Sequence, residues 1–206
     1  MYSQVIHELR RAYDLMVEER DKKEVVAWKI EERQRFLSLL QQEGQKKLLE
    51  IGAGTGIHGQ FFQENGLEVV CTDLSPEMVK RCQQKGLAAY VMDFLHLEFP
   101  DNSFDAIYAM NCLLHVPRSD LPKVMEALRG LLRPGGLFYW GQYGGIEREG
   151  TWPDDHYEPK RFFSFLTDEQ AQEIAARSFQ LVSFKQIRLQ EENADVHFQS
   201  MILRRR

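Results

Sequence analysis

A glycine-rich segment and an acidic residue downstream of it are the parts of this sequence whose chemistry is easiest to predict. The segment runs Glu50-Ile51-Gly52-Ala53-Gly54-Thr55-Gly56, and Asp73 lies roughly twenty residues further on. Glycines between a strand and a helix let the backbone approach a ligand closely, and the start of the helix offers unpaired N–H groups. A carboxylate that ends the following strand can accept hydrogen bonds from ribose hydroxyls. Together these residues predict a site for a nucleotide-like ligand.

The spacing of the glycines separates two classes of nucleotide-binding protein. Gly52, Gly54 and Gly56 form the pattern G-x-G-x-G. A dinucleotide fingerprint would instead need glycine or alanine at the position of Ile57. The spacing therefore disfavours a nicotinamide-dependent oxidoreductase, an alternative that binding of a reduced dinucleotide would test.

Hydrophobic periodicity predicts the elements that position these residues. Apolar residues three and four apart indicate helix over roughly the first forty residues, with the charged run 18–23 as a break. Strand-like and helix-like segments then alternate, which is typical of a parallel sheet covered by helices on both faces. Ser75 and Ser119 are expected N-caps. We predict strands at 48–51, 67–73, 88–93, 105–110 and 137–141, helices at 55–65, 75–85, 119–132 and 167–177, and a closing hairpin of 180–188 with 196–203 across a turn at 191–195.

The whole chain, 1–206, is predicted to form one domain, because its length and its 43% content of hydrophobic residues suit a single core. We divide it into an N-terminal helical cap (1–43), a cofactor-binding core (46–141), an aromatic insertion (142–166) and a closing helix with hairpin (167–206). The insertion follows neither period and mixes glycines and prolines with aromatic residues. We expect it to be an ordered but irregular segment that serves as a substrate lid.

Charge and cysteine content exclude several classes of partner. The net charge of -5 offers no general attraction to phosphate backbones, so no nucleic-acid partner is expected. Cys71, Cys82 and Cys112 show neither metal-ligand spacing nor a paired framework, so we expect no metal site and a reducing, cytoplasmic location. The sequence shows no signal-peptide pattern and no bilayer-spanning apolar run, so no membrane partner is expected. No feature of the sequence specifies an oligomeric state.

Four further segments extend the glycine motif: Asp73–Met78, Met92–Phe94, Phe104–Ala109 and Leu131–Phe138. With Glu50–Gly56 in the pattern acidic-x-G-x-G-x-G, this set resembles the class I S-adenosylmethionine-dependent methyltransferases, in particular small-molecule methyltransferase domains of type 11 or 25, across 48–138. The resemblance implies a Rossmann-like α/β three-layer sandwich. Its mostly parallel seven-stranded sheet would have the order 3-2-1-4-5-7-6, with strand 7 antiparallel, beneath an N-terminal helical lid. It also implies methyl transfer from S-adenosyl-L-methionine to a small-molecule O, N, S or C nucleophile, which leaves S-adenosyl-L-homocysteine.

The same resemblance implies which residues contact the cofactor. The glycine loop would lie under the methionyl part, with Glu50 orienting the loop and Asp73 holding the ribose. Leu74, Met78 and Phe94 would surround the adenine, and Asp93 would accept its exocyclic amine, while Met110 and Asn111 would lie near the transferable methyl. The full implied set is Glu50, Ile51, Gly52, Ala53, Gly54, Gly56, Asp73, Leu74, Met78, Met92, Asp93, Phe94, Met110 and Asn111.

Candidate residues for the methyl acceptor come from loops after the strands and from the N-terminal helix. In-line displacement at a sulfonium needs mainly closeness, alignment and little water, so a catalytic base is optional. His115 and Tyr143 are candidate catalytic residues because they follow strands at the expected cofactor face. The alternative for His115 is a loop histidine that packs or caps the next helix, and for the aromatic residues it is core packing. Candidate substrate contacts are Tyr13, Trp28, His115, Tyr143, Trp152, His156 and Tyr157.

Two other functions remain open at this level. One is an RNA or protein methyltransferase, although 111–114 reads Asn-Cys-Leu-Leu and lacks the Asn/Asp-Pro-Pro-Tyr motif of base-amine methylation. The other is a cofactor-binding module without catalysis, or a partner subunit of a methyltransferase complex, because fold and cofactor sites persist in inactive relatives.

Overall fold

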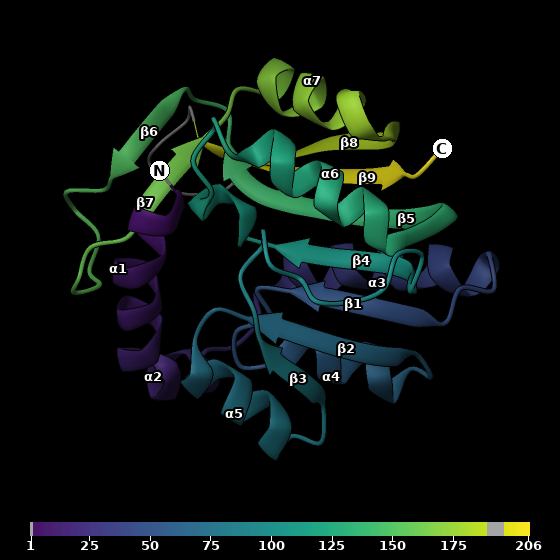
Figure 1. The fold of residues 1–206 in the computed structure, drawn as a ribbon, viewed down its shortest axis with the longest axis horizontal. Helices are drawn as coiled ribbons and strands as arrows, with labels where there is room; N and C mark the ends of the chain where they lie inside the picture. The colour runs from purple at the N-terminus through teal and green to yellow at the C-terminus, as the bar shows by residue number, and fades with distance from the viewer. Residues whose placement is uncertain (1, 189–195) are drawn as a thin grey trace.

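Seven strands pair into one sheet in the computed structural model, which describes residues 2–188 and 196–206 (Figure 1). The order is β3-β2-β1-β4-β5-β9-β8, with β9 antiparallel to both neighbours. Its labels differ from the expected 3-2-1-4-5-7-6 because two further strands, β6 and β7, intervene in the chain and form a sheet of their own. The strands of the large sheet are β1 (Lys47–Ile51), β2 (Glu68–Asp73), β3 (Ala88–Val91), β4 (Phe104–Met110), β5 (Leu132–Gly144), β8 (Gln180–Arg188) and β9 (His197–Arg204).

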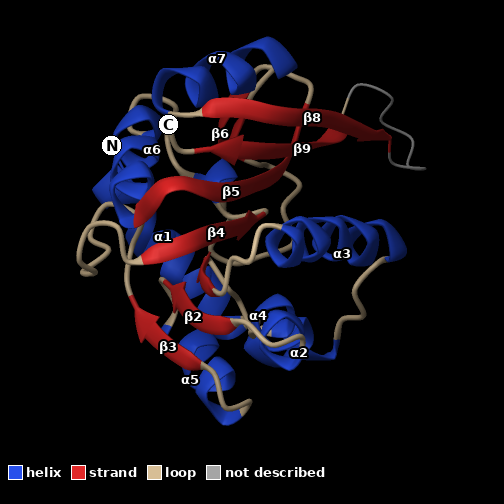
Figure 2. Ribbon diagram, turned by 90° about the vertical axis from the view of Figure 1, so that its right-hand side faces the viewer, coloured by secondary structure: helices blue, strands red, loops and turns tan. Residues whose placement is uncertain are grey.

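Helices cover both faces of this sheet (Figure 2), so the predicted three-layer α/β class is confirmed. Because side chains alternate across a strand, Leu49 and Ile51 of β1 join one buried cluster and Leu48 joins the other. The first cluster includes α6 and α7, and the second includes α3, α4 and α5. The helices are α1 (Tyr2–Leu15), α2 (Val17–Lys22), α3 (Ala27–Gln42), α4 (Ile57–Glu64), α5 (Pro76–Gln84), α6 (Leu121–Leu131) and α7 (Asp168–Ser178), with a 3₁₀ turn, η1 (Leu113–His115).

The two predicted N-caps have different outcomes. The Ser75 hydroxyl accepts the N–H of Met78 at 3.1 Å and caps α5, as expected. The prediction for Ser119 is wrong, since α6 begins at Leu121. Ser119 lies in the preceding turn, in which the Pro117 carbonyl accepts the N–H of Asp120. Asp120 occupies the N-cap, but its carboxylate accepts the backbone N–H of Tyr2 at 3.0 Å instead of capping the helix. A contact between distant segments has therefore replaced the local cap.

The segment 142–166 is more regular than predicted. Strand β5 continues to Gly144, and a hairpin follows in which β6 (Arg148–Thr151) pairs antiparallel with β7 (Phe162–Phe165). The rings of Phe163 and Phe165, which point to the same side of β7, stack with centroids 5.5 Å apart. We call the two strands β6 and β7, with the loop that joins them, the β6–β7 hairpin. The expected turn at 191–195 lies outside the described residues.

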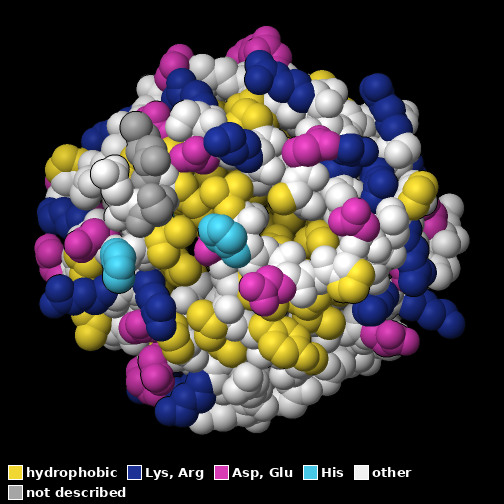
Figure 3. All heavy atoms as spheres, in the orientation of Figure 1, with side chains coloured by type: hydrophobic (Ala, Val, Ile, Leu, Met, Phe, Trp, Pro, Cys, Tyr) yellow, Lys and Arg dark blue, Asp and Glu magenta, His cyan; other side chains and the backbone are white. Residues whose placement is uncertain are grey.

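The N-terminal helices and the β6–β7 hairpin lie beyond the ends of the parallel strands. Figure 1 shows α1, α2 and this hairpin at the edge toward which the arrows of β1, β2 and β4 point. Open α/β sheets bind ligands at this edge, outside the carboxyl ends of the strands. Among the helices that the structure describes, none combines the length and apolarity needed to cross a bilayer. The face in Figure 3 mixes acidic and basic side chains and carries no broad area of one sign.

Candidate active site

A cavity with an empty volume of about 520 Å³ opens at the carboxyl ends of β1, β2 and β4. We call it the inner cavity. Nine of its wall residues were predicted from the sequence as cofactor contacts: Gly52, Gly54, Asp73, Leu74, Met92, Asp93, Phe94, Met110 and Asn111.

The glycine loop has a backbone shape that other residues would strain. Gly52 and Gly54 have φ angles of 60° and 57°, in the left-handed region. A β-carbon at Gly52 would lie 2.3 Å from Cβ of Cys112, which is closer than carbon atoms can approach. The Gly54 N–H donates a hydrogen bond to Asp73 Oδ2 at 2.8 Å. The loop therefore passes close to the cavity and is tied to the end of β2.

The Asp73 carboxylate is held rigidly at the cavity wall. Its Oδ1 accepts the Ser75 N–H at 2.9 Å, while Oδ2 accepts that of Gly54. Burial raises the pKa of Asp73, although these N–H groups and the charge of Arg20 act in the opposite direction. Each carboxylate oxygen can accept a second hydrogen bond. The geometry suits a ligand that presents hydroxyl groups to a fixed carboxylate.

One end of the inner cavity is aromatic. The ring of Phe94 stacks on that of Tyr2, with centroids 6.3 Å apart and an interplanar angle of 10°. Asp93 beside it accepts the N–H of Leu95 at 2.8 Å and contacts the ring of His96. Tyr2 was not among the predicted site residues, yet it is 3% exposed and lines the cavity from α1. This end suits a flat, apolar ring.

Asn111 supplies an unpartnered acceptor between β4 and η1. Its φ of 54° is rare for a residue with a side chain, and its N–H donates to the Gly141 carbonyl at 2.7 Å. Its Oδ1 is buried and has no hydrogen-bond partner among the described residues. A buried acceptor without a donor costs about 1–3 kcal/mol. The strained backbone and this free oxygen together point to a ligand donor, such as an amino group, at this position.

Three predicted cofactor residues lie behind the walls of the inner cavity. Ile51 and Met78 are fully buried in the core, and Gly56 packs under α5, where a β-carbon would meet Leu87 at 2.7 Å. Glu50 lines a second cavity together with Ala53. Burial raises the pKa of Glu50 to about 8. Glu50 therefore lies beside the Cys71 thiol as a largely neutral group at pH 7, and its expected role in orienting the loop stays a prediction.

This second cavity adjoins the inner one, and the two share Gly52, Met110, Asn111, His115, Tyr13 and Arg20. We call it the adjoining cavity, with an empty volume of about 840 Å³. It continues into a wider hollow, the entrance cavity, between α2, α3 and the β6–β7 hairpin. A ligand in the adjoining cavity would face one in the inner cavity across Gly52 and Asn111.

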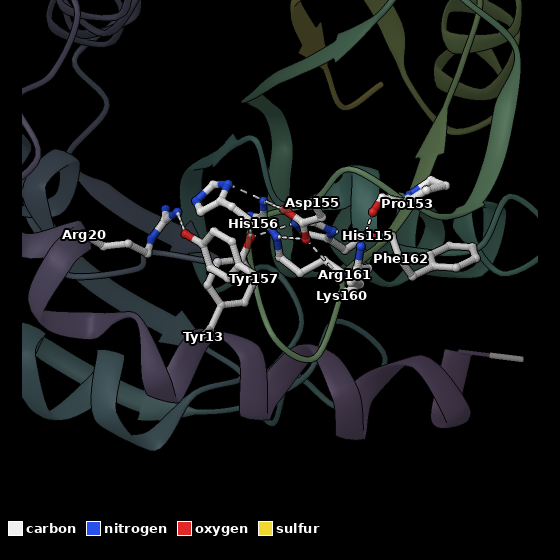
Figure 4. A network of polar contacts seen from close by, with 10 residues as sticks. All are labelled: Tyr13, Arg20, His115, Pro153, Asp155, His156, Tyr157, Lys160, Arg161 and Phe162. Atoms are coloured by element: carbon white, nitrogen blue, oxygen red, sulfur yellow. Dashed lines mark hydrogen bonds and ion pairs between the residues drawn. The ribbon is translucent and has the colours of Figure 1, made fainter.

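His115 and Tyr13 meet where the two cavities join (Figure 4). His115 Nδ1 lies 2.7 Å from the Phe162 carbonyl oxygen, which can only accept, so Nδ1 carries the proton. Nε2 therefore accepts the Tyr13 hydroxyl, 2.7 Å away. Burial lowers the pKa of His115 to about 3, so the imidazole is neutral at physiological pH. Both residues were predicted from the sequence as candidate substrate contacts, and the fold brings them into hydrogen-bond contact.

A network of polar contacts ties the insertion to the N-terminal helices (Figure 4). Asp155 accepts three N–H groups of Arg161, at 2.9, 2.9 and 2.7 Å. The Arg161 guanidinium lies 3.5 Å from the ring centroid of Tyr157 and also donates to the Tyr13 hydroxyl at 3.2 Å. From α2, Arg20 donates to the Tyr157 hydroxyl at 3.2 Å. Tyr157 thus belongs to the junction between lid segments.

The remaining predicted substrate residues separate into two groups. Trp28 and Tyr143 line the entrance cavity with ring centroids 6.4 Å apart. Trp152 packs on Phe165 under Arg148, and the His156 side chain is 64% exposed. Neither is a wall residue of the three cavities. The structure therefore brings Trp28 and Tyr143 to the site and leaves Trp152 and His156 outside it.

Sequence analysis did not predict several residues that line the cavities. Arg20, Lys23, Lys29, His58 and Arg161 all line the adjoining cavity. Charged residues on short helices and loops usually face solvent, so nothing in their local pattern marked them. Tyr2 could have been found, because it lies on the same helical face as Leu9 of α1. Within residues 2–188 and 196–206, no cluster of three or more His, Cys, Asp or Glu side chains could hold a metal ion.

In comparison with known proteins, one family model, described as a methyltransferase domain, matches residues 49–140 of the chain. Phosphoethanolamine N-methyltransferase of Plasmodium falciparum (isolate 3D7) is 26% identical over 167 residues, 77% of this chain and 62% of the relative. Ubiquinone biosynthesis O-methyltransferase of Xanthomonas oryzae pv. oryzae (strain PXO99A) is 33% identical over 100 residues, 45% of this chain and 41% of the relative. The chain thus spans less than two thirds of the length of these curated relatives.

A solved structure shares the fold over the whole chain. It is 1,6-didemethyltoxoflavin-N1-methyltransferase of Burkholderia thailandensis, with bound 1,6-didemethyltoxoflavin and S-adenosylhomocysteine. The TM-score is 0.75 at 21% sequence identity, and the match covers 100% of this chain and 90% of the other. At this identity the likeness establishes the fold.

Proposed function

We propose that the chain is a class I S-adenosylmethionine-dependent methyltransferase, and that it transfers the methyl group of that cofactor to a small-molecule nucleophile. The observation that carries this proposal is the inner cavity, where a left-handed glycine loop, the fixed Asp73 carboxylate and an aromatic end meet. A cytoplasmic location remains a proposal that rests on the free cysteines.

The residues of the inner cavity fit the cofactor. Asp73 would accept the ribose hydroxyls, and Phe94 with Tyr2 would enclose the adenine. The unpartnered Oδ1 of Asn111 would accept the methionyl ammonium, and the glycine loop would lie beneath this part. When bound, the cofactor would supply a methyl group on its sulfonium sulfur, which a nucleophile takes by in-line attack while the thioether of S-adenosylhomocysteine leaves. The reacting atom of the acceptor would then lie in the adjoining cavity, near Gly52 and Asn111.

The protein's own contribution would be alignment and exclusion of water. Tyr13 contacts both cavities, and His115 holds its hydroxyl. A pKa of about 3 makes His115 a poor general base at neutral pH, since an effective base has a pKa near the working pH. We therefore propose that His115 positions Tyr13, and that Tyr13 contacts the acceptor. Tyr143 and Trp28 would contact the acceptor from the entrance cavity.

A small acceptor is favoured over a macromolecule because the site is roofed. α1, α2 and the β6–β7 hairpin close over the ends of the strands and are joined through Tyr13, Arg161 and Tyr157. The relatives named above methylate nitrogen and oxygen, so amines and hydroxyl compounds are the first acceptors to assay. Transfer of a labelled methyl group to RNA or protein, and not to any small molecule, would overturn this part of the proposal.

Cofactor binding is the direct test. Calorimetric titration should show saturable binding of S-adenosylmethionine and S-adenosylhomocysteine. Asp73→Ala should weaken both by about tenfold to hundredfold, because hydrogen bonds to a charged group contribute about 1.5–3 kcal/mol each. Asp101→Ala, an exposed carboxylate beside α6, is the matched control and should bind normally. No binding by the unaltered protein would refute the function, and unchanged affinity of a folded Asp73→Ala would refute the ribose assignment.

A further inference from the structure

The adjoining cavity carries more positive than negative charge. Arg20, Lys23, Lys29 and Arg161 line it, against one carboxyl group, that of Glu50. Asp155 already pairs with Arg161, at 2.7 Å. Since burial raises the pKa of Glu50 to about 8, this carboxyl group neutralises little of the excess at pH 7. None of the ion pairs among residues 2–188 and 196–206 involves the other three cations.

Lys29 is the cation best placed to bind a ligand. It is half-buried on α3, and its Nζ lies 5.2 Å from the ring centroid of Trp28 and 5.8 Å from that of Tyr143. These two aromatic faces fix the ammonium group in place. Burial, with the like charges of Arg20 and Lys23, lowers the pKa of Lys29 to about 8. An ammonium group held away from water among other cations favours an anionic partner.

His58 provides a second, independent observation that points to a ligand in this cavity. It lies in the first turn of α4 and lines both the adjoining and the entrance cavities. Its Nδ1 is buried and has no hydrogen-bond partner among the described residues. The neutral imidazole can carry its proton on this nitrogen and donate to an oxygen of a ligand. Lys29 and His58 thus offer a charge and a donor in one cavity.

The remaining cations divide between the two cavities. Arg20 lies over the glycine loop, where a β-carbon at Gly54 would be 3.7 Å from its Nη2, and it lines the inner cavity. Arg20 therefore serves the cofactor side, which includes the methionyl carboxylate. Lys23 and Lys29 do not line the inner cavity. The cofactor itself has a net charge of +1, with a sulfonium, an ammonium and a carboxylate group, so it cannot balance the excess.

We infer that the methyl acceptor carries an anionic group, a carboxylate or a phosphate, which binds Lys29 and His58 in the adjoining cavity with Lys23 at its outer side. This inference rests on the proposed function and names the class of its acceptor. The nucleophile would be at the other end of the molecule, directed toward Gly52 and Asn111. Glu24, which lines only the entrance cavity, leaves the net charge of the pair of cavities positive.

Titration of small anions into the cofactor-loaded protein tests the inference. The protein is first saturated with S-adenosylhomocysteine, and sodium phosphate or sodium acetate is then added at constant ionic strength, with calorimetry or NMR as the readout. We expect saturable binding of at least one anion. Lys29→Met should weaken it about tenfold, as loss of one charge-assisted contact implies, whereas Lys29→Arg should retain it. Lys123→Met, an exposed lysine of α6, is the matched control and should bind as the unaltered protein does.

Each other outcome of this titration contradicts the inference. No saturable anion binding, or equal binding by a folded Lys29→Met, would overturn it while leaving the proposed function intact. Anions that displace S-adenosylhomocysteine would show that Lys29 holds the cofactor's carboxylate, which would also overturn it. Failure of S-adenosylhomocysteine to bind at all would instead refute the proposed function.

Turnover with matched acceptors distinguishes the two anions. Amines and hydroxyl compounds are supplied in sets of three, in which the same nucleophile is neutral, bears a carboxylate or bears a phosphate. We expect the carboxylate or the phosphate member to react at least about tenfold faster at limiting concentration, with the preference lost in Lys29→Met. Equal or faster transfer to the neutral members would overturn the inference.

Discussion

Residues at the ends of β1, β2, β3 and β4 and just after them form most of the inner cavity, whereas the adjoining cavity brings in side chains from segments far apart in the sequence. In the first, the backbone shape at Gly52 and one carboxylate, Asp73, do most of the positioning. In the second, Lys29, His58 and Arg161 come from α3, α4 and the insertion, and meet only after the lid has packed. The inner cavity therefore depends mainly on local geometry and the adjoining cavity on tertiary contacts, so substitutions should affect the two cavities separately.

The largest effect is expected at the glycine loop. Gly52→Ala places a β-carbon 2.3 Å from Cβ of Cys112 on a backbone with φ of 60°. The strained conformation and the clash should together cost about 3 kcal/mol of folding free energy and abolish measurable cofactor binding. Gly44→Ala is the control, because Gly44 has a similar φ of 68° but open space around it. It should cost only about 1 kcal/mol and leave cofactor affinity unchanged. Urea denaturation and calorimetry measure both quantities.

Asp155→Asn should loosen the packing around the adjoining cavity and leave the inner cavity unchanged. Burial alone would raise the pKa of Asp155, but the hydrogen bonds and charge of Arg161 hold it below its usual value. The pair thus stabilises the closed lid above the unfolded pKa of about 4 and loses this effect as pH falls through the lowered value. We expect the local opening free energy of the β6–β7 hairpin to fall by about 2 kcal/mol, as measured by hydrogen exchange.

The exposed neighbour Asp154 provides the control for this change. Asp154→Asn should leave hydrogen exchange in 148–165 unaltered. Weaker S-adenosylhomocysteine binding in Asp155→Asn, comparable to that expected for Asp73→Ala, would show that the two cavities are not independent.

Tyr13→Phe should act on turnover more than on binding. It removes the hydroxyl that donates to His115 and accepts from Arg161, while the ring contact with Tyr157 remains. We expect kcat to fall about tenfold, equivalent to about 1.4 kcal/mol, with cofactor affinity within twofold of normal. Tyr157→Phe is the control for loss of a buried hydroxyl in the same network and should change kcat less. An equal decrease of kcat in both variants would contradict contact with the acceptor and would show that the Tyr13 hydroxyl only stabilises the network.

The smallest expected effect is a pH dependence of anion binding. Below its pKa of about 8 Lys29 is charged, so acetate affinity should fall as pH rises through this value. If only the charged form binds, the decrease from about pH 7 to 8.5 is about fourfold. Lys29→Arg should remove this slope. The groups that face Lys29 are Arg20, Lys23, Glu24, His58 and Tyr143, and persistence of the slope in Lys29→Arg would assign it to one of them.

Sequence patterns predicted the centre of the large sheet well because β1, β2 and β4 are short, largely apolar runs between turns. The hairpin β6–β7 was missed for a physical reason. Its first strand, Arg148-Glu149-Gly150-Thr151, has no apolar alternation, so only pairing with β7 makes it a strand. The cap at Ser119 failed for a related reason, since Asp120 is engaged by Tyr2 of a distant helix. Predictions failed where a long-range contact replaced a local preference.

Site residues, too, were predicted correctly where local sequence determines them and not where distant segments do. Gly52, Gly54 and Asp73 could be located from spacing alone, whereas Met78 was placed at the adenine but lies in the core. Arg20 and Lys29 were not predicted as site residues, because a charged residue on a helix is usually exposed to solvent. Only the packing of α2 and α3 over the strand ends gives these cations their place in the cavity walls.

The sequence by itself predicted the layered α/β fold and most of the residues at the strand ends that line the inner cavity. It could do so because positive φ angles at glycines and a carboxylate at a strand end act through the local backbone, which short motifs encode. Tertiary structure decided the adjoining cavity. The neutral state of His115, the bond to Tyr13 and the lowered pKa of Lys29 all arise from burial and from charges contributed by distant segments. These properties exist only once the lid has closed over the sheet.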